Sequence, residues 1–244
     1  TGLKTSDKMS NPYFQFKQFT VWHDKCAMKV GTDGVLLGAW TSVQGAHSIL
    51  DVGTGTGLVA LMLAQRSLPN TNIVALEIDE AAAGQAKENI VRSPWKKQIE
   101  VVQADFRKYQ SPEKFDVIVS NPPYFVDSLG CPDQQRNSAR HNDSLTYEEL
   151  LEGVTGLLTE NGTFTIVIPM DVADRVKMIA SEKKLQAVRQ LNVITKPGGI
   201  PKRTLITFSF SNQECIVEEL LTEVARHQYS KEYIALTREY YLNM

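Results

Sequence analysis

An amide, two prolines and an aromatic ring stand together at Asn121-Pro122-Pro123-Tyr124, directly after the apolar run 115–120. Because proline fixes φ and has no N–H, this turn is stiff and its carbonyl oxygens stay free to accept hydrogen bonds. The oxygens could accept the hydrogens of a planar NH2 group, and the ring of Tyr124 could stack on that group. The plainer interpretation is a proline-rich exit from a buried strand with a packed tyrosine.

A glycine-rich turn, Gly53-Thr54-Gly55-Thr56-Gly57, follows the short apolar stretch 48–52 and precedes an apolar stretch typical of a helix. Such a turn lets a ligand approach backbone N–H groups at the start of the helix. The dinucleotide-binding fingerprint requires glycine or alanine at the position of Leu58. The sequence therefore disfavours a phosphate ligand at this turn.

Acidic residues end the next two expected strands. Glu77 lies 20 residues beyond Gly57, where an acid can accept both hydroxyls of a ribose. The alternative is a helix cap, and Asp79 fits that role better because a clear helix follows it. Asp105 could accept from an amino group, and the neighbouring Phe106 could pack on a ring.

Cations gather in two expected loops. The loop 195–203 carries cations and no acid, and the long irregular segment 125–143 carries two arginines. A long loop beside a site usually has a function, although a solvated surface would have the same composition. The candidate phosphate contacts are Arg136, Arg140, Lys196, Lys202 and Arg203.

The segment Lys29 to Gly34 precedes an apolar stretch expected to be a helix from Val35 to Trp40. Thr32 or Asp33 could cap this helix, or the segment could form the edge of a lid over a ligand. On residue types the cap is the preferred interpretation.

Strand and helix patterns alternate along the chain, which predicts an α/β fold with a doubly wound, mainly parallel sheet of seven strands and one antiparallel strand near the end. Residues 1–45 are expected to form an N-terminal extension or lid on a domain of residues 46–244. This domain includes the C-terminal tail 216–244, expected to be a strand end followed by helices. The turn 160–162 should precede the fifth strand. The expected strands are 48–52, 72–76, 99–103, 115–120, 163–168, 185–194 and 204–210, and the main helices are 58–66, 80–91, 146–158 and 172–181.

Ligands in such sheets bind beyond the carboxyl ends of the strands, and every motif above falls at that edge. Composition adds exclusions. No run approaches the roughly 18 apolar residues of a membrane span. The three cysteines, Cys26, Cys131 and Cys215, lie far apart, which predicts reduced thiols in a cytoplasmic protein and no metal site. Because the net charge is −2, a nucleic-acid binder would have to use a local patch of positive charge. For the oligomeric state, a monomer is the simpler expectation.

Taken together, the segment Asp51–Gly57, Glu77, Asp105 and the turn Asn121–Tyr124 resemble the motif set of class I S-adenosylmethionine-dependent methyltransferases. The branch with Asn-Pro-Pro-Tyr methylates planar nitrogens, either exocyclic amines of bases or a glutamine amide. The flanking segments Lys29–Trp40 and Tyr229–Tyr241 narrow the resemblance to the bacterial tRNA1(Val) adenine N6-methyltransferase family. That family modifies adenine 37, beside the anticodon, and the match runs from about residue 16 to residue 242.

The resemblance implies a role for each motif. Asn121 and the Pro122 carbonyl would accept the two N6 hydrogens of the adenine, and Tyr124 would stack on the base. Asp51 and the glycine turn would hold the methionine part of the cofactor, Glu77 the ribose, and Asp105 with the Phe106 backbone the cofactor's adenine. The implied cofactor contacts are Lys29, Thr32, Asp33, Asp51, Gly53, Thr54, Gly55, Gly57, Glu77, Ile78, Asp105, Phe106 and Asn121.

Four alternatives remain at this stage. Glutamine methyltransferases acting on release factors share the Asn-Pro-Pro-Tyr turn but carry a sizeable N-terminal helical domain, whereas only about 45 residues precede the first sheet strand here. DNA or ribosomal-RNA amino methyltransferases usually add a recognition domain for which this chain has no spare segment. A nucleotide-binding oxidoreductase conflicts with Leu58, and a catalytically silent binding module conflicts with the intact set of candidate residues.

Overall fold

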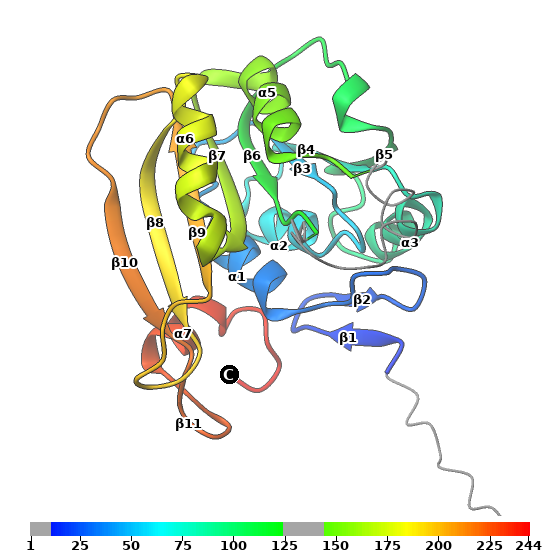
Figure 1. Ribbon diagram of the computed structural model, residues 1–244. Coiled ribbons are helices and arrows are strands. Elements are labelled where there is room, and N and C mark those ends of the chain that lie inside the picture. Colours follow the sequence, from blue (N-terminus) through cyan, green and yellow to red (C-terminus); the bar gives the residue numbers. More distant parts are fainter. Residues whose placement is uncertain (1–10, 124–143) are drawn as a thin grey trace, which may run out of the picture.

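The computed structural model describes residues 11–123 and 144–244, and an eight-stranded sheet with helices on both faces forms its centre (Figure 1). The strand order is β10-β8-β9-β7-β6-β3-β4-β5. The strands are β3 (Ser48–Val52), β4 (Asn72–Glu77), β5 (Ile99–Gln103), β6 (Phe115–Ser120), β7 (Leu158–Pro169), β8 (Gln186–Ile194), β9 (Arg203–Ser209) and β10 (Ile216–Leu221).

The helices divide into two layers, which bury two separate hydrophobic clusters against the sheet. Helices α1, α2 and α3 contribute to one cluster and α5 and α6 to the other, so the sheet is covered on both faces (Figure 1). The elements are α1 (Thr32–Trp40), α2 (Leu58–Arg66), α3 (Glu80–Val91), α5 (Tyr147–Leu157), α6 (Ala173–Glu182), α7 (Lys231–Thr237) and the 3-10 turns η1 (Phe106–Lys108) and η2 (Met170–Val172).

Strand β9 runs antiparallel between β7 and β8, and the other neighbouring pairs of this sheet are parallel. The predicted fold class is confirmed, with eight strands in the sheet instead of seven. Because β9 reverses direction between them, β8 ends at the same edge as β7. The loop 195–202 therefore lies at the carboxyl edge, as predicted.

The eighth strand, β10, forms the first part of the tail, for which the sequence predicts a strand end followed by helices. It pairs with β8 from Ile216 opposite Arg189 to Leu221 opposite Ile194. Four of its six residues are exposed, so its sequence lacks the apolar alternation that predicts a strand. A short hairpin of β11 (Glu223–Ala225) and β12 (Gln228–Tyr229) follows, and the tail contains one helix, α7.

Two local predictions were wrong. The expected turn 160–162 is a bulge inside β7: Leu158 pairs with Phe115, and the next pair is Thr163 with Val117. The N-cap of α1 is Gly31, and no side chain caps this helix, so neither Thr32 nor Asp33 has the capping role.

Helix α1 is buried along nearly its whole length and belongs to the core. Every residue from Gly34 to Trp40 is buried, and a Cβ at Gly38 would lie 2.8 Å from the Cβ of Met62 in α2. A helix that is apolar all round needs partners all round. The N-terminal segment is thus anchored by α1 to the layer that covers the sheet.

The two ends of the described chain pack together at the carboxyl edge. The N-terminal hairpin consists of β1 (Tyr13–Gln15) and β2 (Thr20–Trp22). Phe16 lies in the connection between these strands and forms a β-bridge with Tyr241. The Phe16 ring stacks on Phe19 at 4.8 Å and on Tyr241 at 5.9 Å between centroids. In residues 11–123 and 144–244, no helix combines the length and the apolar character that crossing a membrane requires.

Candidate active site

A cavity of about 550 Å³ opens at the carboxyl ends of β3 and β6, between the loop 27–34 and the glycine turn. Pro123 of the Asn-Pro-Pro turn lines it too. Ala27 and Met28 also line the cavity, and no sequence pattern indicated them as ligand contacts because small and apolar loop residues carry no such signal. The predicted site residues that line it are Lys29, Thr32, Asp33, Asp51, Gly53, Thr54, Gly55 and Asn121.

The glycine turn requires glycine for its backbone conformation. Gly53, Gly55 and Gly57 have φ values of +74°, +55° and +87°, in the left-handed region that other residues rarely adopt. A Cβ at Gly53 or Gly55 would meet no atom within 4 Å, so the glycines leave open space on the cavity side. The turn can therefore admit a ligand close to the backbone.

Four of the five N–H groups of this turn have acceptors within the protein. Gly53 and Thr54 donate to the Leu76 carbonyl at 2.9 and 2.8 Å, and Gly55 donates to Oε1 of Glu77 at 2.9 Å. Gly57 donates to the Thr54 carbonyl at 2.9 Å. These bonds argue against a phosphate-binding turn, in agreement with the residue at position 58.

Glu77 stands at the end of β4 with both carboxylate oxygens oriented. Its Oε2 accepts from the Asp79 N–H at 3.0 Å, in addition to the bond from Gly55 to Oε1. Each oxygen keeps a further lone pair for a hydroxyl donor. Asp79 caps α3 by accepting from Ala82 N–H at 2.9 Å, as predicted. Glu77, Ile78 and Gly57 lie beyond the cavity lining.

Asp51 presents a buried carboxyl group to the cavity. The residue is 1% exposed, and burial raises the pKa of Asp51 to about 7, partly opposed by the Thr54 hydroxyl, which donates to Oδ2 at 2.7 Å. The negative charge of Glu77 raises the pKa further. A cationic ligand beside Asp51 would lower this raised pKa, because a nearby positive charge favours the ionised form of a carboxyl group.

Asn121 occupies the end of β6 beside α1. The preceding Ser120 is buried and donates its hydroxyl to the Val52 carbonyl at 3.0 Å, which ties the ends of β6 and β3 together. The Asn121 amide nitrogen lies 3.8 Å from the sulfur of Met28, and it would lie 3.5 Å from a Cβ at Gly34. The amide oxygen is then the atom that a ligand donor can use.

Three of the predicted residues, Tyr124, Arg136 and Arg140, lie outside the described residues.

Asp105 pairs with Arg107 at 2.9 Å and accepts from its backbone N–H at 3.0 Å, and these hydrogen bonds hold the pKa of Asp105 below its usual range. Phe106 is buried against α5, where a Cβ at Gly153 would lie 2.3 Å from its ring. The prediction that the ring of Phe106 packs on a ligand conflicts with this burial, which leaves only its backbone for such a role.

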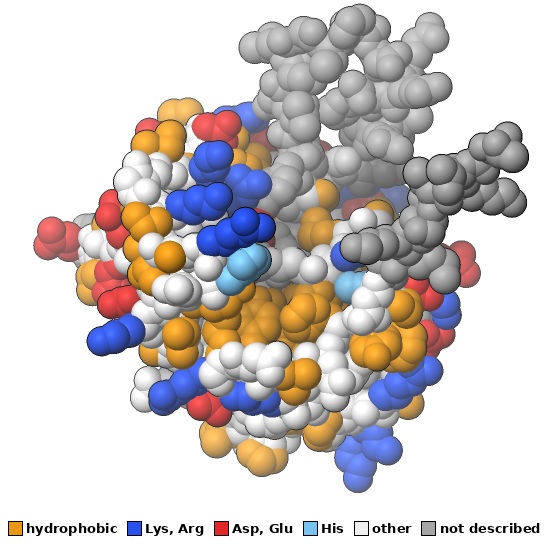
Figure 2. Space-filling view, turned by 90° about the horizontal axis from the view of Figure 1, so that it is seen from below, with side chains coloured by type: hydrophobic (Ala, Val, Ile, Leu, Met, Phe, Trp, Pro, Cys, Tyr) orange, Lys and Arg blue, Asp and Glu red, His pale blue; other side chains and the backbone are white. Residues whose placement is uncertain are grey.

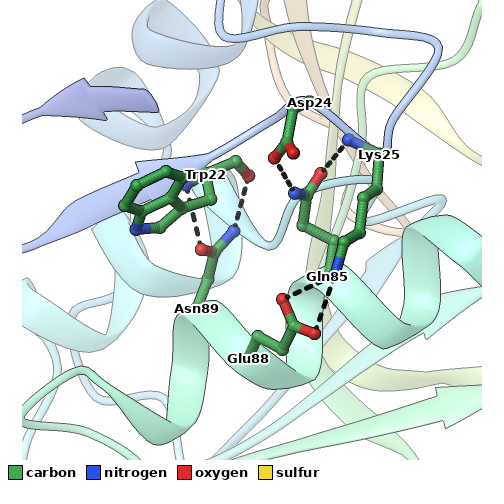
Figure 3. Close-up of polar contacts among 6 residues, drawn as sticks. All are labelled: Trp22, Asp24, Lys25, Gln85, Glu88 and Asn89. Atoms are coloured by element: carbon green, nitrogen blue, oxygen red, sulfur yellow. Dashed lines mark hydrogen bonds and ion pairs between the residues drawn. The ribbon is translucent and has the colours of Figure 1, made fainter. Parts of the chain in front are cut away.

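Two buried amides on α3 hold the entrance segment 22–25 in place (Figure 3). Asn89 accepts from Trp22 N–H and donates to the carbonyls of Trp22 and Thr56, each at 2.9 Å. Gln85 accepts from Lys25 N–H at 3.0 Å and donates to Asp24 at 2.7 Å. Sequence reasoning missed both amides, although two polar residues four apart on the alanine-rich side of a helix are a usable signal.

His23 fixes the next part of this segment. It is 7% exposed, its Nδ1 accepts from Val30 N–H at 3.1 Å, and its Nε2 lies 2.8 Å from the Asn11 carbonyl. The loop that carries Lys29 is therefore held by part-buried hydrogen bonds to His23, a residue that is itself buried.

The predicted loop cations have different environments. Arg203 pairs with Asp33 at 3.2 Å and so links the start of β9 to α1. Lys196 and Lys202 are exposed. Among the described residues no group of acidic, histidine or cysteine side chains has a metal-binding arrangement, and the described cysteines, Cys26 and Cys215, are free thiols.

A glycine turn after β3, an acid at the end of β4 and an Asn-Pro-Pro turn after β6, on a sheet with this strand order, define a class I methyltransferase. Solved structures agree at the level of the fold. A predicted O-methyltransferase from Agrobacterium tumefaciens superposes with a TM-score of 0.68 at 17% identity, over 87% of this chain and 100% of that one. A glycopeptide N-methyltransferase in complex with S-adenosyl-L-methionine has a TM-score of 0.55 at 13% identity, over 75% of this chain and 90% of that one.

The sequence itself matches the methyltransferase small domain over residues 30–195. It is 81% identical to a tRNA1(Val) (adenine(37)-N6)-methyltransferase from Bacteroides thetaiotaomicron, over 97% of this chain and 100% of the relative. It is 41% identical to the enzyme of the same name from Yersinia pestis, over 99% and 98%. The chain belongs to the tRNA1(Val) (adenine(37)-N6)-methyltransferase family and is a methyltransferase.

We expect Asn89→Ala to destabilise the fold by about 2–4 kcal/mol, because it leaves the buried carbonyl of Thr56 and two part-buried backbone groups of Trp22 without partners. Urea unfolding followed by tryptophan fluorescence measures this loss. The nearby Lys25–Glu88 pair, with side chains 53% and 44% exposed, supplies the control. Lys25→Ala should cost less than about 1 kcal/mol. Equal losses for the two variants would contradict the assignment of the segment's support to the buried amide.

Asp51 should make the ligand-free protein less stable as the pH rises. Its pKa is raised on folding, so its contribution to stability is complete below the unfolded value of 3.8 and is lost as the pH rises through about 7. Asp51→Asn should therefore gain roughly 2 kcal/mol relative to the wild type between pH 5 and pH 8. Melting temperatures across this range measure the gain. Replacement of the exposed Glu160 by Gln should follow the wild-type profile, and a constant offset for Asp51→Asn would refute the prediction.

Proposed function

We propose that the protein transfers a methyl group from S-adenosyl-L-methionine to the N6 atom of adenine 37 in tRNA1(Val). The similarity over the whole chain to enzymes of that name carries the proposal. The arrangement of the cavity supports it, because Asn121 lies beside the residues proposed to hold the cofactor. A tRNA substrate also implies a cytoplasmic location.

The residues around the cavity fit the proposed cofactor. S-adenosyl-L-methionine carries an ammonium group and a sulfonium, and Asp51 is a buried carboxyl whose ionised form a cation would favour. Glycines in the left-handed region leave room beside the backbone, and Glu77 is oriented for ribose hydroxyls. The nucleobase end would reach Ile78, which is 47% exposed, and the carboxylate of Asp105.

Asn121 and Pro122 would prepare the nitrogen for attack. The N6 lone pair of adenine is delocalised into the ring, which makes the nitrogen a poor nucleophile. When the Asn121 side-chain oxygen and the Pro122 carbonyl accept its two hydrogens, the nitrogen moves toward tetrahedral geometry and the lone pair becomes localised. The bound cofactor supplies a methyl group that the sulfonium already activates, so the protein contributes mainly positioning and electrostatic stabilisation.

RNA recognition would use the cations near this edge. Lys196 and Lys202 are exposed on the loop between β8 and β9 and are proposed to contact phosphates, together with Arg136 and Arg140. Arg203 would act through its ion pair with Asp33 as well as through its charge. The target adenine must leave its stack to reach the proposed stacking partner Tyr124, which is easier in an anticodon loop than in a duplex.

A methyl-transfer assay with tritium-labelled S-adenosyl-L-methionine tests the substrate. The protein is mixed separately with unmodified tRNA1(Val), ribosomal RNA and unmethylated release factor. Label is expected in the tRNA alone and should appear as N6-methyladenosine after digestion. Label in release factor would overturn the substrate while retaining a role for Asn121, and the absence of label from all three would overturn the proposed function.

We expect Asn121→Ala to lower the rate of methyl transfer at least a hundredfold, because one acceptor of the N6 hydrogens is lost in the transition state. Cofactor affinity, measured by calorimetry, should stay within about twofold of the wild type. The conservative variant Asn121→Asp retains an acceptor and should keep more activity than the alanine variant. A parallel loss of cofactor affinity and rate would assign Asn121 to cofactor binding instead.

A further inference from the structure

A second cavity of about 550 Å³ lies beside the first at the carboxyl edge. Thr32 and Asp33, at the start of α1, line both cavities. The far wall comes from the two ends of the described chain and contains four aromatic residues, Phe14, Tyr229, Tyr233 and Tyr241. Viewed from this side, the surface is hollowed, with hydrophobic side chains in the hollow and Lys and Arg side chains beside it (Figure 2).

The four rings form a continuous cluster with one open member. Ring centroids lie 5.3 Å apart for Tyr229 and Tyr233, 6.4 Å for Tyr233 and Tyr241, and 6.0 Å for Phe14 and Tyr241. Tyr233 is only 4% exposed, which packing of the tail explains. Among the described residues, Tyr229 packs on Tyr233 and is still 42% exposed at the cavity, so part of its ring is open to a ligand.

The position of Tyr229 is fixed by its hairpin. The next residue, Ser230, donates its N–H to the Thr222 carbonyl at 2.9 Å and caps α7 by accepting from Tyr233 N–H at 3.0 Å. Glu223, the pairing partner of Tyr229, donates its N–H to the Thr195 carbonyl at 3.1 Å. The ring is therefore presented by a hairpin bonded to the end of β8.

Polar groups of two kinds surround the rings. Lys202 lines the cavity, and its backbone carbonyl accepts from Met170 N–H at 2.9 Å, which places the start of its side chain. Lys196 is exposed on the same loop. Glu223 also lines the cavity and supplies a carboxylate acceptor. Ring faces, a hydrogen-bond acceptor and nearby cations match the face, the amino edge and the phosphate of a nucleotide.

We propose that this second cavity holds the nucleotide next to the target adenine, with its base stacked on Tyr229. Glu223 accepts from an amino group of that base, and Lys202 contacts the adjoining phosphate. The assignment rests on the proposed function, since the occupant belongs to the same RNA. Thr32 and Asp33 form a wall shared by the second cavity and the first. The first cavity contains Asn121, which is proposed to bind the target adenine, so the two cavities adjoin as two neighbouring nucleotides require.

The test is a cycle of protein and RNA changes. Affinities for unmodified tRNA1(Val) transcript are measured with S-adenosyl-L-homocysteine present, for the wild type and for Tyr229→Leu. Two further transcripts each carry an abasic nucleotide on one side of the target adenine. Tyr229→Leu should weaken binding of the complete transcript about tenfold, because base stacking on an aromatic ring is lost. With one of the two abasic transcripts, Tyr229→Leu should bind as tightly as the wild type does, because the base that stacks on Tyr229 is already missing.

Three controls distinguish stacking from damage to the fold. Tyr229→Phe keeps the ring and should bind like the wild type. Tyr13→Leu removes a ring that is 37% exposed outside this cavity and should also bind like the wild type. The melting temperature of Tyr229→Leu should match that of the wild type, which would show that the fold is intact.

Several outcomes would overturn the assignment. Unchanged affinity of Tyr229→Leu for tRNA, or losses that add for both abasic transcripts, would remove the base from this cavity. A wild-type dimer that Tyr229→Leu converts to a monomer would assign the surface to a second copy of the chain. Failure of the wild type to methylate the complete transcript would overturn the proposed function and the assignment with it, whereas the other outcomes overturn the assignment alone.

Discussion

The hydrogen bonds that join the glycine turn to the end of β4 are the constraint on which the site depends. Leu76 and Glu77 accept three N–H groups from the turn, so the chain after β3 has to bend in the left-handed conformation that glycine permits. The same bonds orient the Glu77 carboxylate and bring Thr54 within 2.7 Å of Asp51. The same hydrogen bonds therefore connect the pairing of β3 with β4, the conformation of the glycine turn and the positions of Asp51 and Glu77.

A second set of buried bonds fits the N-terminal segment to that arrangement. Asn89 bonds both to Trp22 in the N-terminal hairpin and to Thr56 in the glycine turn, so one side chain joins the entrance segment to the cofactor side. Such hydrogen bonds contribute more to stability than exposed ion pairs do, because breaking them leaves polar groups that are at least partly shielded from water. The loop that lines the cavity is therefore a structural part of the domain.

Periodicity predicted most of the fold, since buried parallel strands and the helices that cover them have strong apolar patterns. The exposed edge strand β10 and the bulge in β7 escaped, because the first lacks alternation and the second depends on pairing with β6. Motifs predicted eight of the residues that line the first cavity, among them Asp51 and Asn121. Met28 and the buried ring of Phe106 could not be placed from residue types, because their environment is set by distant segments, the turn after β6 and helix α5.

The position of α1 sets the spacing between the two cavities at the carboxyl edge. The helix is buried from Gly34 onward and packs closely on α2 through Gly38, so it cannot shift without disturbing the core. Its first residues, Thr32 and Asp33, separate the cavities, and the ion pair of Asp33 with Arg203 extends this wall to β9. The packed core therefore sets the distance from the Asn-Pro-Pro turn to the second cavity, which the four aromatic rings line. A substrate that spans both cavities meets a spacing fixed before it binds, which lowers the cost of ordering the site.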